Sequence, residues 1–137
     1  MAHEDPPAGE GLAAFQRRYW AAWDACDLEA TAECLDADFS GTFAGPAGQA
    51  VLVLGRAETL AMVAAFFARV RGERASWRRS GLLPLHRGGD EAAVAMRVEC
   101  RFPDHPAWDN AELTVETYRR GVDGRWRLWR AHSERLR

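Results

Sequence analysis

Residues 94–102 read VAMRVECRF, and this stretch decides the fold class of the chain. Apolar side chains occupy every second position, and Ala95, Arg97, Glu99 and Arg101 stand between them. A period of two places the apolar side chains on one face of a β-strand, where they can pack against a core. The stretch therefore predicts a strand with one buried face.

Three further strands are predicted around this one. Residues 75–86 precede it and end at the turn-forming run Arg87-Gly88-Gly89-Asp90. Residues 111–120 and 125–135 follow it and flank a second turn, Gly121-Val122-Asp123-Gly124. Short turns of this kind join neighbouring antiparallel strands. The second half of the chain is therefore expected to form a four-stranded antiparallel meander.

The first half has helical periodicity. Apolar residues recur three or four positions apart between Leu12 and Cys26, which predicts an amphipathic helix. Asp27 is suited to cap a second, shorter helix that extends to Leu35, and the polar run Asp36 to Asp38 is expected to end it. These two helices should form a helical hairpin.

Two short apolar runs and a third helix complete the first half. Residues 39–43 and 51–54 lie on either side of a glycine- and proline-containing turn and predict a small β-hairpin. Residues 56–71 then return to helical spacing and stop at Gly72. The overall expectation is an α+β fold, with a curved antiparallel sheet packed against three N-terminal helices.

Composition limits the classes of function. The chain has 137 residues, with 47% hydrophobic and 28% charged residues and a formal net charge of -2. Residues 12–137 are expected to form one domain, and residues 1–11 a flexible leader. Because the arginines are interspersed with acidic residues, we expect no nucleic-acid partner. No stretch has the length and apolarity of a membrane span or the pattern of a secretory signal, so we expect a cytoplasmic protein without a membrane partner.

A family resemblance follows from the order of these elements. The segment FQRRYWAAWDACDLEATAECLDADFSGTF at residues 15–43 and the strand pair ELTVETYRRGVDGRWRLWRAHSE at residues 112–134 frame the third helix. This arrangement resembles the superfamily that includes nuclear transport factor 2, ketosteroid isomerases and SnoaL-like polyketide cyclases. The resemblance implies a cone-shaped fold around a cavity for a small hydrophobic molecule. It also implies a homodimer formed through the outer face of the sheet.

Two residues are the main polar candidates for that cavity. Against ketosteroid isomerase, Tyr19 matches a tyrosine that hydrogen-bonds a substrate oxygen, although it could also be a core tyrosine bonded to backbone. Glu116 matches a protonated carboxylic acid, and burial in an apolar cavity favours the neutral form of a carboxyl group. Glu116 could instead lie on the other face as a solvated glutamate. The same comparison places Phe43 where the isomerase has its catalytic aspartate, so ketosteroid-type isomerisation is not expected.

Three other groups of residues are weaker candidates. His132 matches a histidine of many SnoaL-like proteins and could act as acid, base or ligand, or simply belong to the sheet or an interface. Asp104, His105 and Asp109 lie on a proline-containing loop that could gate the cavity, but their spacing gives no convincing metal site. Asp36 and Asp38 are expected to be solvated. We expect no metal and no cofactor.

The sequence leaves three functions open. The first is a small-molecule-binding domain, the second is a cofactor-independent isomerase, cyclase or lyase with Glu116 as acid or base, and the third is a dimeric scaffold. The candidate catalytic residues are Glu116, Tyr19 and His132. The residues expected to line the pocket for an apolar or aromatic ligand are Phe15, Tyr19, Trp23, Phe43, Met96, Val98, Trp108, Glu116, Tyr118 and Trp129.

Overall fold

The computed structural model describes residues 9–45 and 51–136. Most of the predicted leader and part of the predicted turn before residue 51 lie outside these residues. The helices are α1 (Leu12–Asp24), α2 (Leu28–Cys34) and α3 (Arg56–Val70), with a 3₁₀ turn, η1, at Pro106–Trp108. The strands are β1 (Leu35–Ala44), β2 (Val51–Gly55), β3 (Ser76–Arg87), β4 (Glu91–Arg101), β5 (Asn110–Arg120) and β6 (Trp126–Arg135). The predicted α+β class is confirmed.

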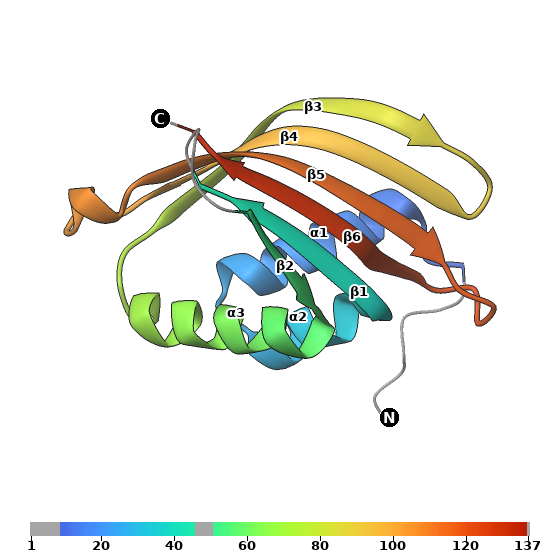
Figure 1. Cartoon of the computed structure of the whole chain (residues 1–137), viewed down its shortest axis with the longest axis horizontal. Coiled ribbons are helices and arrows are strands. Elements are labelled where there is room, and N and C mark those ends of the chain that lie inside the picture. The colour runs from blue at the N-terminus through green and yellow to red at the C-terminus, as the bar shows by residue number, and fades with distance from the viewer. Residues whose placement is uncertain (1–8, 46–50, 137) are drawn as a thin grey trace.

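The strands form one curved sheet in the order β2-β1-β6-β5-β4-β3 (Figure 1). The predicted meander comprises β3 to β6, and each neighbouring pair in it is antiparallel. The predicted hairpin comprises β1 and β2. A parallel pairing between β1 and β6 joins the hairpin to the meander. The sequence did not predict this parallel contact, because no local pattern reports which distant strands become neighbours.

The boundary between α2 and β1 differs from the prediction. We expected Asp36 to Asp38 to end the second helix as solvated residues, but α2 ends at Cys34 and the acidic run is already part of β1. Asp36 is buried and accepts hydrogen bonds from Arg119 Nε and Nη2 at 3.2 and 3.0 Å. The pairing with Arg119 on β5 explains how an aspartate is accommodated at the start of this strand.

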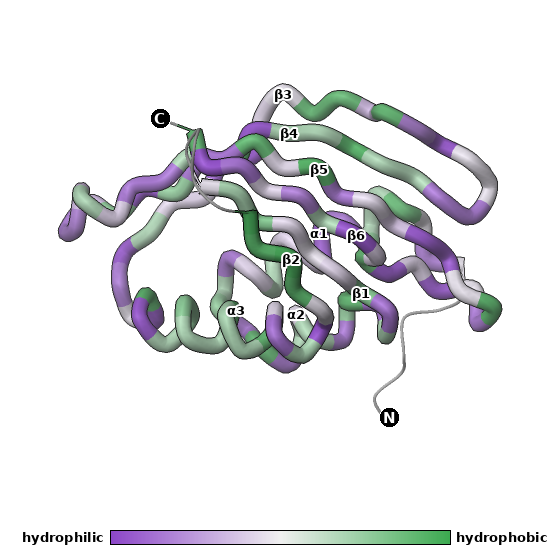
Figure 2. The backbone as a smooth tube through the Cα atoms, viewed as in Figure 1, coloured by the Kyte–Doolittle hydropathy of each residue, from purple (hydrophilic) through white to green (hydrophobic). Residues whose placement is uncertain are grey.

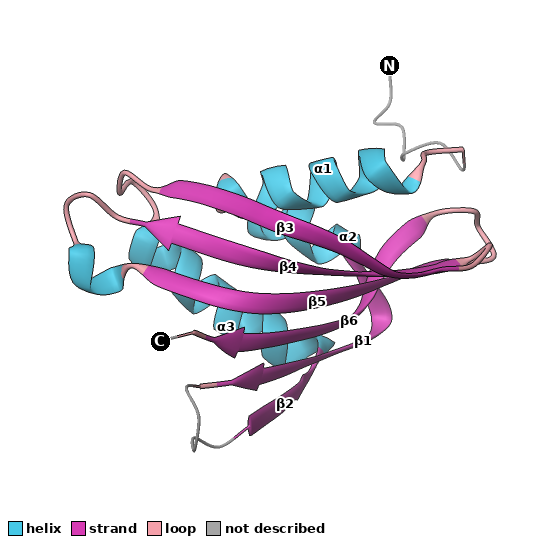
Figure 3. Cartoon of the chain, turned by 90° about the horizontal axis from the view of Figure 1, so that it is seen from above, coloured by secondary structure: helices cyan, strands magenta, loops and turns pink. Residues whose placement is uncertain are grey.

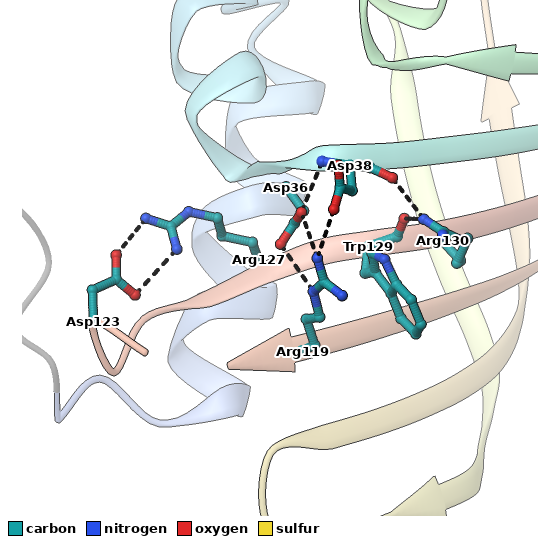
Figure 4. Close-up of polar contacts among 7 residues, drawn as sticks. All are labelled: Asp36, Asp38, Arg119, Asp123, Arg127, Trp129 and Arg130. Carbon is teal, nitrogen blue, oxygen red and sulfur yellow. Dashed lines mark hydrogen bonds and ion pairs between the residues drawn. The ribbon is translucent and has the colours of Figure 1, made fainter. Parts of the chain in front are cut away.

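A polar network connects the adjacent ends of β1, β5 and β6 (Figure 4). Arg119 also approaches Asp38, and Arg130 Nη1 donates to the Asp38 carbonyl oxygen at 2.7 Å. The guanidinium carbons of Arg119 and Arg130 lie 4.6 and 4.3 Å from the ring centroid of Trp129. Trp129 sits at a register shift of β6 against β5. The network therefore holds an irregular part of the sheet in place.

All three helices lie on the concave side of the sheet (Figure 3). Between them and the sheet is a core of buried residues from α1, the α2–β1 junction and the middle of the strands. The largest fully buried side chains in the described part of the chain include Tyr118, Phe15, Phe67 and Met96. The apolar faces that the helical spacing and the alternation along the strands predicted therefore meet in one layer between helices and sheet.

The convex side of the sheet is not covered by any described helix (Figure 3). Strand pairing aligns Leu83, Ala95, Val115 and His132 in one row across β3 to β6. Apolar residues also remain exposed elsewhere on the sheet, notably Val53 on β2, which is 71% exposed. Figure 2 shows hydrophobic segments on both outer strands, β2 and β3.

None of the helices in the described ranges is long and apolar enough to cross a membrane.

Candidate functional site

A cavity of about 520 Å³ lies between the concave face of the sheet and the helices. Its volume is within the range of small-molecule sites. Aromatic and aliphatic side chains dominate its wall, among them Tyr19, Trp23, Leu35, Phe39, Phe43, Val63, Phe66, Trp77, Val98 and Leu128. Its polar lining residues are Thr31, Thr59, Arg79, Asn110, Glu112, Thr114, Glu116, Ser133 and Arg135.

Glu116 is the buried carboxyl group of this cavity. It lies in the middle of β5 and is only 6% exposed, since the alternation of the strand turns it to the concave face together with Thr114 and Tyr118. Trp20 Nε1 donates to Glu116 Oε1 at 3.0 Å, and the Tyr118 hydroxyl donates to the same oxygen. Both donors converge on Oε1, and no described residue forms a hydrogen bond with Oε2.

The net effect of the surroundings of Glu116 is to raise its pKa. Burial raises the pKa of Glu116 above its ordinary value, although the hydrogen bonds from Tyr118 and Trp20 and the charge of Arg79 act in the opposite direction. A neutral carboxyl group has one carbonyl oxygen and one hydroxyl oxygen. In the protonated form of Glu116, the two donors at Oε1 would match the carbonyl oxygen and the proton would lie on Oε2.

Tyr19 lies on the same wall of the cavity, one helical residue before Trp20. Its ring stacks on Phe15 with a centroid separation of 6.4 Å, and its hydroxyl forms no hydrogen bond with any described residue. Burial raises the pKa of Tyr19 well above that of an ordinary tyrosine, so the hydroxyl stays protonated. A tyrosine hydroxyl in a cavity wall, without a protein partner among the described residues, is suited to hydrogen-bond a bound molecule.

Arg79 is a polar wall residue that sequence reasoning missed. It lies on β3, and its side chain is only 12% exposed. Arg79 Nη1 and Nη2 donate to the two carboxylate oxygens of Asp24 at 3.0 and 2.9 Å. Its guanidinium carbon lies 5.3 Å from the ring centroid of Trp20 and 5.8 Å from that of Trp77. The sequence did contain a pattern that could have predicted this position. Trp77 and Arg79 are two residues apart, so in a strand they lie on the same face.

The cavity wall contains half of the residues that the sequence analysis assigned to a ligand pocket. Tyr19, Trp23, Phe43, Val98 and Glu116 line it. The others do not. Phe15, Met96 and Tyr118 are almost fully buried in the core that supports the wall, Trp108 packs against Phe102 on the β4–β5 loop, and Trp129 lies in the polar network of Figure 4.

His132 does not join the cavity. Ala131 and Ser133 line the cavity, so the intervening His132 projects from the opposite, convex face of β6. Its Nε2 lies 3.1 Å from Glu134 Oε1. The structure therefore separates His132 from Glu116 and Tyr19.

The candidate residues of the β4–β5 loop form local contacts outside the cavity. Asp104 accepts two hydrogen bonds from Arg74, and His105 Nε2 lies 3.1 Å from Glu73 Oε2. Asp109 accepts a hydrogen bond from the Phe102 backbone N–H. Within residues 9–45 and 51–136, no group of three or more potential ligands is arranged to hold a metal ion.

Three cavity residues carry buried oxygen atoms with no hydrogen-bond partner among the described residues. These atoms are Thr31 Oγ1, Thr59 Oγ1 and Asn110 Oδ1. The sequence analysis did not select these residues, because single polar residues on helices and at a strand start have no distinguishing spacing. Unsatisfied buried polar atoms are uncommon in proteins, and their grouping in one cavity marks it as more than ordinary core.

Phe43 occupies a cavity position for a steric reason. Gly41 precedes it on the same face of β1, and a Cβ atom on Gly41 would lie 2.7 Å from Phe43 Cε2 and 3.3 Å from Phe39 Cζ. The missing side chain thus lets both rings pack close to the strand. This packing gives the cavity an aromatic floor and places no acidic group at this part of β1.

A cone of helices and curved sheet around an internal cavity defines the class of the protein. Residues 16–129 match the SnoaL-like domain family, so the chain belongs to that family. The fold is the cystatin-like α+β cone of nuclear transport factor 2-like proteins.

Solved structures share this fold over nearly the whole chain. A nuclear transport factor 2-like protein of unknown function from Pseudomonas putida has a TM-score of 0.73 and 18% identity, over 90% of this chain and 82% of that one. A protein from Streptomyces avermitilis, provisionally assigned as a dehydratase of the same family, has a TM-score of 0.70 and 21% identity, over 92% and 94% of the two chains. At such identities the likeness establishes the fold alone. Among curated proteins, none matches the chain significantly.

Proposed function

We propose that this protein binds a small, mostly apolar molecule in the cavity and offers it one neutral carboxylic acid as a hydrogen-bond donor. The arrangement around Glu116 carries the proposal. Trp20 and Tyr118 fix Oε1 from the protein side, and Oε2 has no hydrogen-bond partner among the described residues. A carbonyl or similar acceptor on the ligand would complete this site, while the aromatic wall would bind its flat body.

The binding proposal can be tested with fluorenone, a flat tricyclic ketone, by isothermal titration calorimetry. Ala131 lines the cavity, so Ala131→Phe should fill part of it and abolish binding. Ala21→Phe is the matched control, because Ala21 is exposed on α1. Equal binding by both variants would place the ligand outside the cavity, and native mass spectrometry of the purified protein would reveal a co-purifying ligand.

A second function, proton transfer to a bound ketone, is favoured by the presence of Glu116 and Tyr19 in the same cavity. In its ionised form Glu116 could take a proton from the carbon beside the carbonyl group and later return a proton to that carbon, and the Tyr19 hydroxyl could hydrogen-bond the carbonyl oxygen as negative charge develops on it. The provisional dehydratase assignment of the Streptomyces protein is consistent with such chemistry. The aromatic Phe43 argues against an aspartate-based isomerisation.

Deuterium exchange tests the enzymatic alternative. α-Tetralone has exchangeable protons beside its carbonyl group, and the exchange in D₂O can be followed by proton NMR. Enzyme-catalysed exchange should disappear in Glu116→Gln and decrease in Tyr19→Phe. Binding of α-tetralone without accelerated exchange would leave the binding function and remove the enzymatic one for this ketone.

The partner on the convex face is proposed to be a second copy of the chain. The row of Leu83, Ala95, Val115 and His132 supplies a mainly apolar strip that no helix of the described residues covers. Such a face is typical of a surface that packs against another sheet.

A further inference from the structure

Arg79 on β3 is held in one orientation by a residue of helix α1. Its Nη1 and Nη2 donate to the two carboxylate oxygens of Asp24 at 3.0 and 2.9 Å. A contact through two parallel hydrogen bonds fixes the plane of a guanidinium group as well as its position. Only 12% of the Arg79 side chain is exposed, so solvent and salt screen this ion pair little. The guanidinium is therefore a fixed, planar group at the junction of α1 and β3.

The same guanidinium packs on the ring of Trp20. Its central carbon lies 5.3 Å from the centroid of the Trp20 ring, a distance at which a guanidinium is attracted to an aromatic face. Trp20 and Asp24 are four residues apart on α1, so one side of the helix presents both the anchor of Arg79 and the ring that Arg79 contacts. Arg79 thereby restricts how the Trp20 ring can turn.

The orientation of the Trp20 ring decides where its polar atom lies. Trp20 Nε1 donates to Glu116 Oε1 at 3.0 Å. An indole has a single N–H, which acts as a donor only, so rotation of the ring would remove this hydrogen bond without replacing it. The Tyr118 hydroxyl reaches the same oxygen from β5 itself. Trp20 thus adds a contact from the helix layer to the carboxyl group of the cavity.

Two other charged residues of the cavity wall lie farther along the sheet. Glu112 is four residues before Glu116 on β5, which is about 13 Å in an extended strand. Arg135 is the neighbour of Glu112 across β5 and β6, so their opposite charges lie side by side. Within the described part of the chain, no hydrogen bond or ion pair joins either of them to Trp20 or Arg79. The contact between Arg79 and Trp20 is therefore independent of this second pair of charges.

We infer that Arg79 is a positioning residue of the binding site: anchored on Asp24, it orients the Trp20 indole so that its N–H holds Glu116 Oε1 and leaves Oε2 for the ligand. This inference rests on the proposed binding function and adds to it a residue that sets how the carboxyl group is presented. Arg79 acts here through its planar shape. A lysine has the same charge, but it has neither the planar group that packs on a ring nor the paired donors for a carboxylate.

Fluorenone and fluorene are a matched pair of ligands for a test. They share the tricyclic body, and only fluorenone has a carbonyl group that can accept a hydrogen bond from Glu116. In full-length Arg79→Met, equilibrium dialysis should show about fivefold weaker binding of fluorenone and binding of fluorene within about twofold of wild type. Arg79→Lys should behave in the same way. Arg78 is exposed and precedes Arg79 on the strand, so Arg78→Met is the control and should bind both ligands as wild type does.

A double-mutant cycle separates positioning from a direct contact between Arg79 and the ligand. Trp20→Phe keeps an aromatic ring beside Arg79 but has no N–H donor. This variant should itself bind fluorenone about fivefold more weakly, and addition of Arg79→Met to it should change the affinity by less than about twofold. A further fivefold loss in the double variant would mean that Arg79 acts on the ligand or on Glu116 directly, and would overturn the inference.

The Trp20 N–H gives a second measurement that needs no ligand. In a nitrogen–proton NMR spectrum, its cross-peak is the one that Trp20→Phe removes. In Arg79→Met this cross-peak should move upfield and its proton should exchange faster with solvent, because the hydrogen bond to Glu116 is no longer held in place. Asp24→Ala removes the anchor of the guanidinium and should have the same effect. Asp24→Ala decides the matter if circular dichroism shows that Arg79→Met is unfolded.

The outcomes separate this inference from the proposed function. Wild-type affinity for fluorenone in Arg79→Lys, or in both Arg79→Met and Asp24→Ala, would overturn the positioning role and leave the binding function intact. An unchanged Trp20 cross-peak in the last two variants would also overturn it. Failure of the wild-type protein to bind fluorenone would count against the proposed function, and the exchange of the Trp20 N–H would still decide whether Arg79 orients the indole.

Discussion

The hydroxyl of Tyr118 donates a hydrogen bond to Glu116, two residues earlier on the same face of β5. The donor and the acceptor are thus fixed by one strand, and Trp20 from α1 completes the arrangement at the same carboxyl oxygen. Tyr118 is fully buried, and burial raises the pKa of its phenol. It therefore remains a donor whenever the protein is folded near neutral pH.

Removal of the Tyr118 hydroxyl should affect Glu116 directly. In Tyr118→Phe, Oε1 keeps the hydrogen bond from Trp20 but loses one that favours the ionised form, so the pKa of Glu116 should rise further. The free energy of unfolding should fall by about 1 kcal/mol, as measured by urea denaturation. Tyr19→Phe is the control, because its hydroxyl has no hydrogen-bond partner in the described chain. An equal loss of stability in the two variants would contradict the expectation that the Tyr118 hydroxyl, and not the Tyr19 hydroxyl, stabilises the fold through a hydrogen bond.

Glu116 should make stability depend on pH. Its pKa is raised in the folded state, so its contribution is fully present below the pKa of an unfolded glutamate and is lost as the pH rises through the folded pKa. Glu116→Gln has no such titration. Relative to that variant, wild type should therefore lose stability as the pH increases from about 4 upward. Thermal unfolding across this range, with carboxyl-carbon NMR of Glu116, measures the effect; a normal or lowered pKa would exclude a neutral carboxylic acid at this site.

Gly41→Ala should narrow the cavity. The new methyl group would overlap the ring of Phe43, which has to move, and overpacking of this kind costs about 1–3 kcal/mol. We expect a lower unfolding temperature and weaker binding of fluorenone. Gly89→Ala is a suitable control, since nothing lies within 4 Å of the Cβ position of Gly89. Unchanged binding in a folded Gly41→Ala protein would mean that Phe43 does not shape the occupied part of the cavity.

Val115→Arg should separate the proposed dimer. Val115 lies in the row that includes Ala95 and His132 on the convex face, so an arginine there would place a charge in the middle of the contact. Sedimentation velocity should show a wild-type dimer and a monomeric variant with an unchanged circular dichroism spectrum. A wild-type monomer at high micromolar concentration would remove this proposal.

The sequence predicted the elements well because their signals are local. The alternation of residues 94–102 and the spacing in α1 each follow from a single face meeting the core. Asp36 escaped correct prediction because its partner, Arg119, is 83 residues away. The end of α1 was also placed two residues late, since Cys26 continues the apolar spacing but has a left-handed backbone with φ of 54°.

Residues of the site could be predicted only where the alternation of faces along a strand, or the three-to-four-residue spacing along a helix, assigned them to a face. These patterns identify a face, and they separate Glu116 from its neighbours only once the face of β5 is known. They do not distinguish a wall residue such as Val98 from Met96, which lies on the same strand but deeper in the core. Depth depends on the curvature of the sheet and on what the helices cover, and these are properties of the assembled fold.

The parallel contact between β1 and β6 also bears on how the protein reaches this fold. β6 lies between the hairpin of β1 and β2 and the other strands of the meander, β3 to β5, so among the described strands it joins these two parts of the sheet. As the chain leaves the ribosome, the two parts can form separately, but the cavity has no continuous wall until residues 126–135 insert between them. We therefore expect a late and comparatively slow assembly step, governed by loop closure over most of the chain.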